Sequence, residues 1–222
     1  MIEPTYERTA LAQLQREKAR FQTHIKLVFE PAAHDCGVCP TAGECCTDAH
    51  FVNVHITRLE AVAMRETIEQ TPRLSREEKQ AVYERARSAI KRYDLRGGAD
   101  SFSRTYSCPL FQPGTGCLVH RRAKPAPCIH HACYDNWEDL PPQSLQDRVE
   151  HRVEQLNNSV YGQAWAWLPT PIWLALVDPD SDGVELARLE RIWATRREPQ
   201  SRAHSPTNLV ARRASLPILN FR

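Results

Sequence analysis

Apolar residues recur at helical spacing near the start of the chain, with charged residues between them. Five of them share one face of an α-helix: Leu11, Leu14, Phe21, Ile25 and Val28. Recurrence at intervals of three and four residues is typical of an amphipathic helix, and Pro31 marks its end. The spacing therefore predicts an N-terminal helix within residues 1–30.

Two capping boxes predict the next two helices. In Thr57-Arg-Leu-Glu60 the hydroxyl can accept from the third helical amide while the glutamate reaches back to the cap amide. This motif predicts a helix through about Glu69. Ser75-Arg-Glu-Glu78 predicts a second helix that ends at Gly97-Gly98. The predicted buried stripe of this second helix is Val82, Ala86, Ala89, Ile90 and Tyr93.

The later part of the chain also favours helices. After Pro141-Pro142, a regular series predicts an amphipathic helix: Leu145, Val149, Val153, Leu156 and Val160. A tryptophan-rich stretch follows, which we interpret as core, and then a short helix around Leu189. No periodicity remains after Arg196, so the end of the chain is expected to be a tail. The one short extended run expected in the chain is Phe51–Ile56.

Cysteines are confined to two segments rich in glycine and proline. The eight cysteines are Cys36, Cys39, Cys45, Cys46, Cys108, Cys117, Cys128 and Cys133. The Cys-x2-Cys turn at Cys36 places two thiolates on one side of a tight loop, as a tetrahedral metal requires. Metal binding would supply folding energy to loops that otherwise have little to hold them. All eight are therefore candidate metal ligands, enough for two four-coordinate sites, and the sequence does not assign them.

The expected fold is mostly α, with irregular cysteine-rich metal-binding loops clamped by amphipathic helices and little β-structure. The expected organisation has four parts: an N-terminal helix over 1–30, a cysteine-cluster metal-binding domain over 31–140, a C-terminal helical extension over 141–195 that packs on it, and a basic tail over 196–222.

The metal identity stays open between two alternatives. Proline follows a candidate ligand at Cys39-Pro40 and Cys108-Pro109, as in ferredoxin-type loops. Two paired Cys-x2-Cys knuckles, typical of zinc sites, are absent. The pattern favours an iron–sulfur cluster, 4Fe-4S in type, with zinc as the alternative. Histidines near the cysteines can replace a thiolate in a zinc site; they are His34, His50, His55, His120, His130 and His131.

The cysteine segments and the helix start between them resemble a known family, the YkgJ-like cysteine-cluster proteins, described as a zinc- or iron-chelating domain with a CxxCxxxCC motif. The resemblance spans Cys36 to Cys133. It rests on the CxxC and CC pairs, on Ile56-Thr57-Arg-Leu-Glu60, and on a C-terminal series of four matching segments: Cys108-Pro-Leu-Phe, Gly116-Cys117-Leu-Val-His120, Pro125-Ala-Pro-Cys128 and Cys133.

The resemblance implies metal chelation by all eight cysteines and leaves the activity open. Five residues rather than three separate Cys39 from Cys45, and Lys124 and Ile129 stand where relatives have arginine. One family member, the flagellin lysine methylase, is thought to use an iron–sulfur cluster, so the resemblance also keeps an enzyme hypothesis open.

Charge and composition refine this picture. The net charge of +2 over 222 residues does not demand a nucleic acid, which makes such a partner unlikely on charge grounds. Residues Arg196–Arg222 carry six arginines and one glutamate, a local charge of +5, so the rest of the chain carries 2 − 5 = −3. This segment is expected to be a solvated tail, with a docking arm for an acidic protein partner or RNA as the alternative.

We expect a cytoplasmic protein without a membrane span. Met1–Phe21 lacks the apolar run of a signal peptide, and the longest apolar stretch, Trp165–Val177, contains two prolines and is shorter than the roughly 20 residues a span needs. Because cytosolic thiols are kept reduced, disulfides are not the expected role of the cysteines.

Two further motifs carry weaker signals. Asp178-Pro-Asp-Ser-Asp-Gly183 resembles the start of a calcium loop, but Leu189 stands where an EF-hand needs glutamate, so we interpret it as a turn and helix N-cap. A thioredoxin-like role for Cys36 and Cys39 is disfavoured because no strand precedes them and Pro40 follows.

Three functional hypotheses remain. The first is a metal-binding protein with a redox, sensing or assembly role. The second is a cluster-dependent enzyme, such as a protein methyltransferase or an oxidoreductase, with a pocket formed by the C-terminal helices. The third is a structural zinc protein that recruits a partner through its basic tail.

Overall fold

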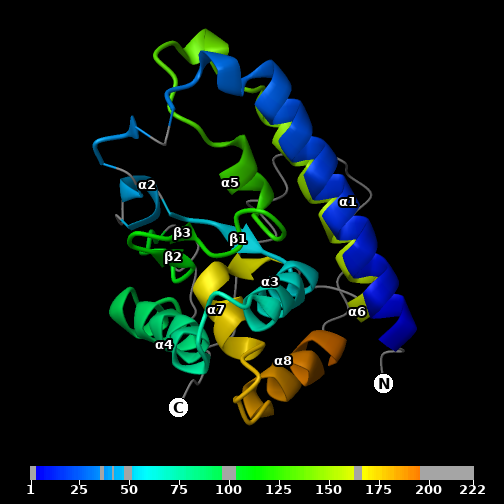
Figure 1. The fold of residues 1–222 in the computed structure, drawn as a ribbon. Helices are drawn as coiled ribbons and strands as arrows, with labels where there is room; N and C mark the ends of the chain where they lie inside the picture. The colour runs from blue at the N-terminus through cyan, green and yellow to red at the C-terminus, as the bar shows by residue number, and fades with distance from the viewer. Residues whose placement is uncertain are drawn as a thin grey trace.

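The protein is mostly helical, as the sequence predicts (Figure 1). The computed structural model describes residues 4–35, 38–41, 43–47, 52–96, 104–162 and 167–195. The α-helices of this part are α1 (Pro4–Val28), α2 (Glu44–Thr47), α3 (Arg58–Gln70), α4 (Arg76–Arg92), α5 (Ala126–His130), α6 (Gln143–Tyr161), α7 (Thr170–Leu176) and α8 (Val184–Thr195). Its strands form two small antiparallel sheets: β1 (His55–Ile56) with β4 (Leu168–Pro169), and β2 (Phe111–Gln112) with β3 (Gly116–Cys117).

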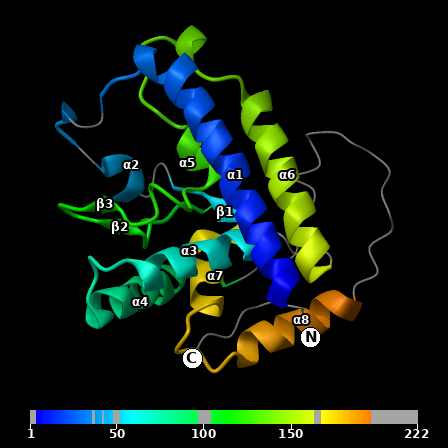
Figure 2. The ribbon, with the colours of Figure 1, turned by 45° about the vertical axis from the view of Figure 1, so that its right-hand side comes forward.

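The two longest helices, α1 and α6, lie side by side along one side of the molecule and run in opposite directions (Figure 2). Ala10 and Leu14 of α1 pack with Val153 of α6 and Leu59 of α3 in one apolar cluster. Exposed arginines lie on both helices, Arg16 and Arg20 on α1 and Arg148 and Arg152 on α6. Within the described ranges, no helix is long and apolar enough to cross a membrane.

The main core lies between α3, α4 and α7. Every residue of α7 is buried, including Trp173, which confirms the core interpretation for this tryptophan. Two backbone interactions join the starts of α3 and α7. Ile56 pairs with Leu168 in the β1–β4 sheet, and the Thr170 amide donates to the Val54 carbonyl at 3.0 Å. The sequence analysis did not predict α7 as a helix.

Both capping boxes form as predicted. The Glu60 amide donates to Thr57 Oγ1 and the Thr57 amide donates to the Glu60 carboxylate, and Ser75 and Glu78 repeat the arrangement at α4. The predicted end of α4 is wrong, because the helix ends at Arg92. Asp94 adopts a positive φ of 50°, which an aspartate tolerates and a continuing helix does not. Gly97-Gly98 lies outside the described residues.

Other predictions differ in detail from the structure. The first helix ends at Val28, and a short 3₁₀ turn at Glu30–Ala32 takes Pro31. Within the described part of the expected extended run, residues 52–56, only His55–Ile56 pairs as a strand, and Phe51 lies outside the described residues. Tyr93 caps α4 and is half-buried, because its hydroxyl bonds to Ser107 Oγ at 2.9 Å.

The acidic segment before α8 is a turn, as predicted. The Asp180 amide donates to Asp178 Oδ1 at 2.9 Å, and the Val184 amide donates to Asp182 Oδ1 at 3.0 Å, which satisfies an amide at the start of α8. The carboxylate of Asp178 is buried and forms an ion pair with Arg87 of α4.

Candidate metal centre

The two cysteine segments meet between α2, the β2–β3 hairpin and α5. Cys45 and Cys46 lie in α2, Cys117 lies in β3, and Cys128 lies in α5. The Cys108 amide donates to the Cys46 carbonyl at 2.7 Å. This backbone bond ties the first segment directly to the second.

A close contact at Gly43 sets the approach of α2 to the hairpin. Gly43 has a φ of +88°, and a Cβ on it would lie 2.0 Å from the ring of Phe111 in β2. Glycine is therefore required both by the backbone conformation and by the aromatic ring. Gly43 immediately precedes α2. This contact therefore fixes the position of α2, and of its two adjacent cysteines, against the hairpin.

The hairpin and α5 position the remaining cysteines of the centre. Phe111 pairs with Cys117 across the hairpin, and the Phe111 amide donates to the Cys108 carbonyl at 3.2 Å. Helix α5 is held by Ala126 and Ile129, which are buried against α1. Packing of α5 on α1 thereby places Cys128 beside the hairpin.

Four thiols converge in this region, and we call them the inner thiols: Cys46, Cys108, Cys117 and Cys128. For every pair among these four cysteines, the negative charge of one, when ionised, raises the pKa of the other. Burial is the larger cause for all four. It raises the pKa of Cys46 and of Cys128 to about 12, and it raises the pKa of Cys108 and Cys117 as well. At neutral pH the metal-free centre therefore holds uncharged thiols.

Charged side chains surround the inner thiols. Lys124 lowers the pKa of Cys117 and Cys128, and Lys18 also lowers that of Cys128, whereas Glu60 raises it. Burial lowers the pKa of Arg85, the charge of Cys108 raises it, and Arg85 Nε donates to the Pro109 carbonyl at 3.0 Å. The sequence analysis did not identify any of these four residues as functional.

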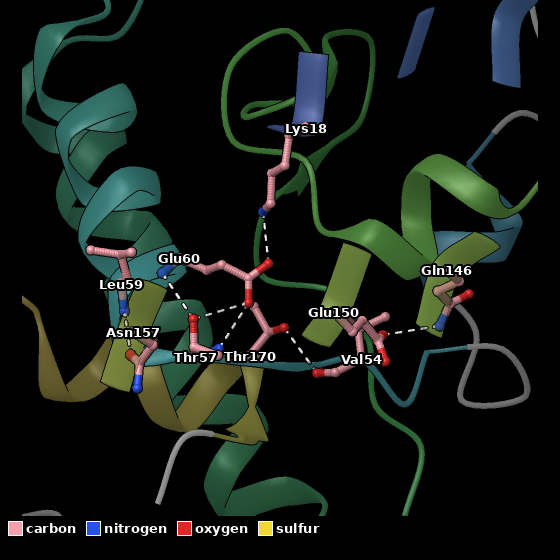
Figure 3. A network of polar contacts seen from close by, with 9 residues as sticks. All are labelled: Lys18, Val54, Thr57, Leu59, Glu60, Gln146, Glu150, Asn157 and Thr170. Carbon is pink, nitrogen blue, oxygen red and sulfur yellow. Dashed lines mark hydrogen bonds and ion pairs between the residues drawn. The ribbon is translucent and has the colours of Figure 1, made fainter. Parts of the chain in front are cut away.

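Lys18 and Glu60 form a buried ion pair at the edge of the centre (Figure 3). Lys18 Nζ lies 2.7 Å from Glu60 Oε1, and the two side chains are 5% and 2% exposed. The sequence could have indicated that Lys18 is buried. Lys18 falls between Leu14 and Phe21 at helical spacing, at a position on the buried face of α1 where an apolar residue is expected.

Of the other cysteines, Cys45 contacts one inner thiol, Cys39 and Cys133 make different contacts, and one lies outside the described residues. Cys45 hydrogen bonds with Cys46 through its side chain, and Cys39 contacts Thr41 Oγ1 at 3.6 Å. Cys133 is exposed, and its carbonyl accepts from the His34 amide at 2.8 Å. Cys36 lies outside the described residues. All seven described cysteines are free thiols.

The donor chemistry of the inner thiols fits a thiolate-bound metal. Four cysteine sulfurs are the ligand set of zinc sites and of iron–sulfur clusters. As the side chains stand, no group of three or more His, Cys, Asp or Glu residues in the described ranges is arranged to hold a metal ion. Metal binding therefore requires the thiols to draw closer and to lose their protons.

The candidate histidines make other contacts. His34 Nε2 lies 2.7 Å from Asp135 Oδ1, and His130 Nε2 lies 3.4 Å from the Pro142 carbonyl. Burial lowers the pKa of His120 and His131, and the nearby charge of Lys124 lowers both further. His55 is buried in β1, and His50 lies outside the described residues.

A groove of about 560 Å³ opens beside Cys117, between the α3–α4 turn and the hairpin. Arg73, Arg121 and Arg122 line it together with His120, and none of its described lining residues is acidic. One inner thiol therefore borders a positively charged, solvent-accessible surface.

Comparison with family models, with curated proteins and with solved structures gave no match for this chain.

Proposed function

We propose that the protein binds a metal through its cysteines, with the inner thiols as the first site and an iron–sulfur cluster favoured over zinc. The observation that carries this proposal is the convergence of four partly buried thiols from two distant segments. Clustering by itself does not stabilise these thiols, because the charge of each thiolate opposes ionisation of its neighbours. A shared cation reverses that repulsion, since the thiolate is the form that a metal binds.

The four outer cysteines extend the proposal to a second site. Eight thiols suffice for two four-coordinate centres, and the outer set consists of Cys36, Cys39, Cys45 and Cys133. Because Cys45 and Cys46 are adjacent and hydrogen bonded, the two sites would be neighbours. An iron–sulfur centre would supply one-electron chemistry, which fits a redox, sensing or assembly role.

Elemental analysis with absorption spectroscopy on anaerobically purified protein tests the metal. An iron–sulfur centre predicts brown protein with iron, acid-labile sulfide and sulfur-to-iron charge-transfer bands. Stoichiometric zinc in colourless protein would refute the iron–sulfur form and support the zinc alternative. Protein that takes up neither metal after anaerobic reconstitution would refute metal binding.

Serine variants test the assignment of ligands. Cys108→Ser and Cys128→Ser should abolish the spectrum of the first site, because serine is a poor ligand for the same metals. Cys133→Ser is the matched control, since Cys133 is exposed and lies outside the inner thiols. Equal loss of the same spectrum in all three variants would contradict the division into inner and outer cysteines.

The groove beside Cys117 favours a cluster-dependent enzyme as a second candidate function. Its arginines suit an anionic substrate group, because guanidinium binds carboxylate and phosphate with two parallel bonds. Calorimetric titration with S-adenosylmethionine and, separately, with inorganic pyrophosphate tests this candidate. Binding that is lost in Arg121→Ala/Arg122→Ala would support it, and absence of binding to the metal-loaded protein would count against it.

The tail and the location of the protein complete the proposal. We place the protein in the cytoplasm, with a protein partner recruited by the basic segment Arg196–Arg222, whose charge is +5. Deletion of this segment should leave metal content unchanged and abolish partner capture from an extract. Loss of metal in the deletion variant would refute this division of roles.

A further inference from the structure

Lys18 occupies a position where a lysine is costly. Its side chain is 5% exposed on the apolar face of α1, and an effective penalty of several kcal/mol attends each buried ion. Replacement of a buried ion pair by apolar residues is often neutral or stabilising. The fold by itself therefore gives no reason for Lys18 and Glu60 to be charged.

The two partners differ in how firmly they are held. Glu60 Oε2 accepts from the Thr57 amide at 2.9 Å and from Thr57 Oγ1 at 3.2 Å, so the capping box fixes this carboxylate. Lys18 Nζ contacts Glu60 as an ion pair and has no well-oriented hydrogen bond within the described chain. Figure 3 shows the ammonium of Lys18 in contact with Glu60, which leaves at least two of its three N–H donors for a second acceptor.

The charges around the inner thiols are complementary to a metal–thiolate centre. Lys18 lies on the buried face of α1, which packs against α5, the helix of Cys128, and it pairs with Glu60. Lys124 and Arg85 also interact electrostatically with inner thiols, so the four side chains together carry 3 − 1 = +2. Four thiolates with a divalent ion or cluster core carry a net charge of about −2. A buried dianion is unstable without compensating charge, whereas the uncharged thiols of the metal-free centre need none.

We propose that Lys18 is a positioning residue for the metal centre, whose ammonium compensates the charge that Cys128 acquires on metal binding, while Glu60 opposes it. This inference rests on the proposed function. In this proposal the buried pair tunes the metal affinity: Lys18 raises the affinity, and Glu60 lowers it.

Anaerobic titration of the full-length, reduced protein with Co²⁺ tests the inference, since sulfur-to-cobalt absorption reports thiolate binding directly. Lys18→Met should weaken the Co²⁺ affinity by about 10- to 100-fold, the usual effect of losing an outer partner of a metal ligand. Glu60→Gln should strengthen the affinity, because it keeps an oxygen acceptor for the Thr57 amide and removes the negative charge. A purely structural pair does not predict these opposite signs.

A double variant keeps the test valid if Lys18→Met fails to fold. Lys18→Met/Glu60→Gln removes both charges and avoids an unpaired buried carboxylate. Compared with Glu60→Gln alone, it differs only at Lys18, and it should bind Co²⁺ about 10- to 100-fold more weakly.

An ion pair elsewhere in the described chain, with Asp178 1% exposed and Arg87 32% exposed, provides the control. Arg87→Met and Asp178→Asn remove charges that are not among the causes of the pKa shifts of the inner thiols. These variants should lower the unfolding free energy and leave the Co²⁺ affinity unchanged.

The outcomes separate this inference from the proposed function. Equal Co²⁺ affinity in the double variant and in Glu60→Gln would overturn the inference while leaving thiolate binding intact. A decrease in affinity in all variants, ranked by their loss of stability, would also overturn it. Failure of the wild-type protein to show sulfur-to-cobalt absorption, together with failure to take up iron or zinc on anaerobic reconstitution, would refute the proposed function itself.

Discussion

The two capping boxes allow one chemical change to be made in two environments within the same protein. Thr57 is 0% exposed at the start of α3, and Glu60 is buried beside it. Ser75 and Glu78 form the same arrangement at α4 and are exposed. The difference in burial should therefore determine how much unfolding free energy is lost when the cap hydroxyl is removed.

The expected magnitudes follow from the bonds in the structure. Ser75→Ala removes an exposed cap, which typically costs about 1 kcal/mol, because water can take the place of the hydroxyl. At α3 the Glu60 amide donates to Thr57 Oγ1 at 3.3 Å in a site that water does not reach. Loss of that acceptor adds about 1–3 kcal/mol for an unsatisfied buried donor. The cost at α3 is therefore expected to be about 2–4 kcal/mol.

The comparison uses Thr57→Ser and Thr57→Ala, because the difference between them is a serine-to-alanine change without the loss of a methyl group. Urea unfolding of the metal-free, reduced protein gives the unfolding free energy of each variant. Far-ultraviolet circular dichroism checks that helix content is retained. A difference between the two Thr57 variants equal to or smaller than the effect of Ser75→Ala would refute the reasoning from burial.

Three further predictions concern the site and the core. Gly43→Ala should weaken Co²⁺ affinity, because the new methyl group collides with Phe111, whereas Gly114→Ala changes a glycine of similar positive φ in open space and should not. The unfolding free energy of the metal-free protein should fall from about pH 9 toward pH 12, because the unfolded chain ionises its thiols near the ordinary pKa of 9.0 while folding raises the pKa of Cys46 and Cys128 to about 12. Metal-saturated protein should lack this thiol-dependent loss. Denaturant midpoints measured as a function of pH check both expectations. Trp173→Ala should cost about 3–5 kcal/mol of unfolding free energy, and Trp137→Ala, at an 81% exposed position, should change it by less than about 0.5 kcal/mol.

Local patterns in the sequence determined where most of the helices lie. The capping boxes set the starts of α3 and α4 because both partners of each box are within four residues of one another. The spacing of apolar residues predicted α1 and α6 for the same reason, since a helical face repeats over a few residues. The confinement of the cysteines to two segments was equally visible from the sequence alone.

Helix α7 and the end of α4 were missed because neither has a local signal of that kind. Two prolines introduce α7, and its residues are all buried, so no polar face gives it an amphipathic period. The end of α4 depends on the backbone conformation of Asp94 and on the contact of Tyr93 with Ser107. Such contacts form only when distant segments meet.

Only the tertiary structure decided which cysteines converge and which charges face them. The grouping of Cys46 with Cys108 depends on a backbone bond between segments far apart in sequence, and the position of Cys128 depends on the packing of α5 against α1. The pairing of Lys18 with Glu60 likewise joins α1 to α3. Electrostatic effects depend on distance in space and on burial, and neither is encoded in the spacing of residues along the chain.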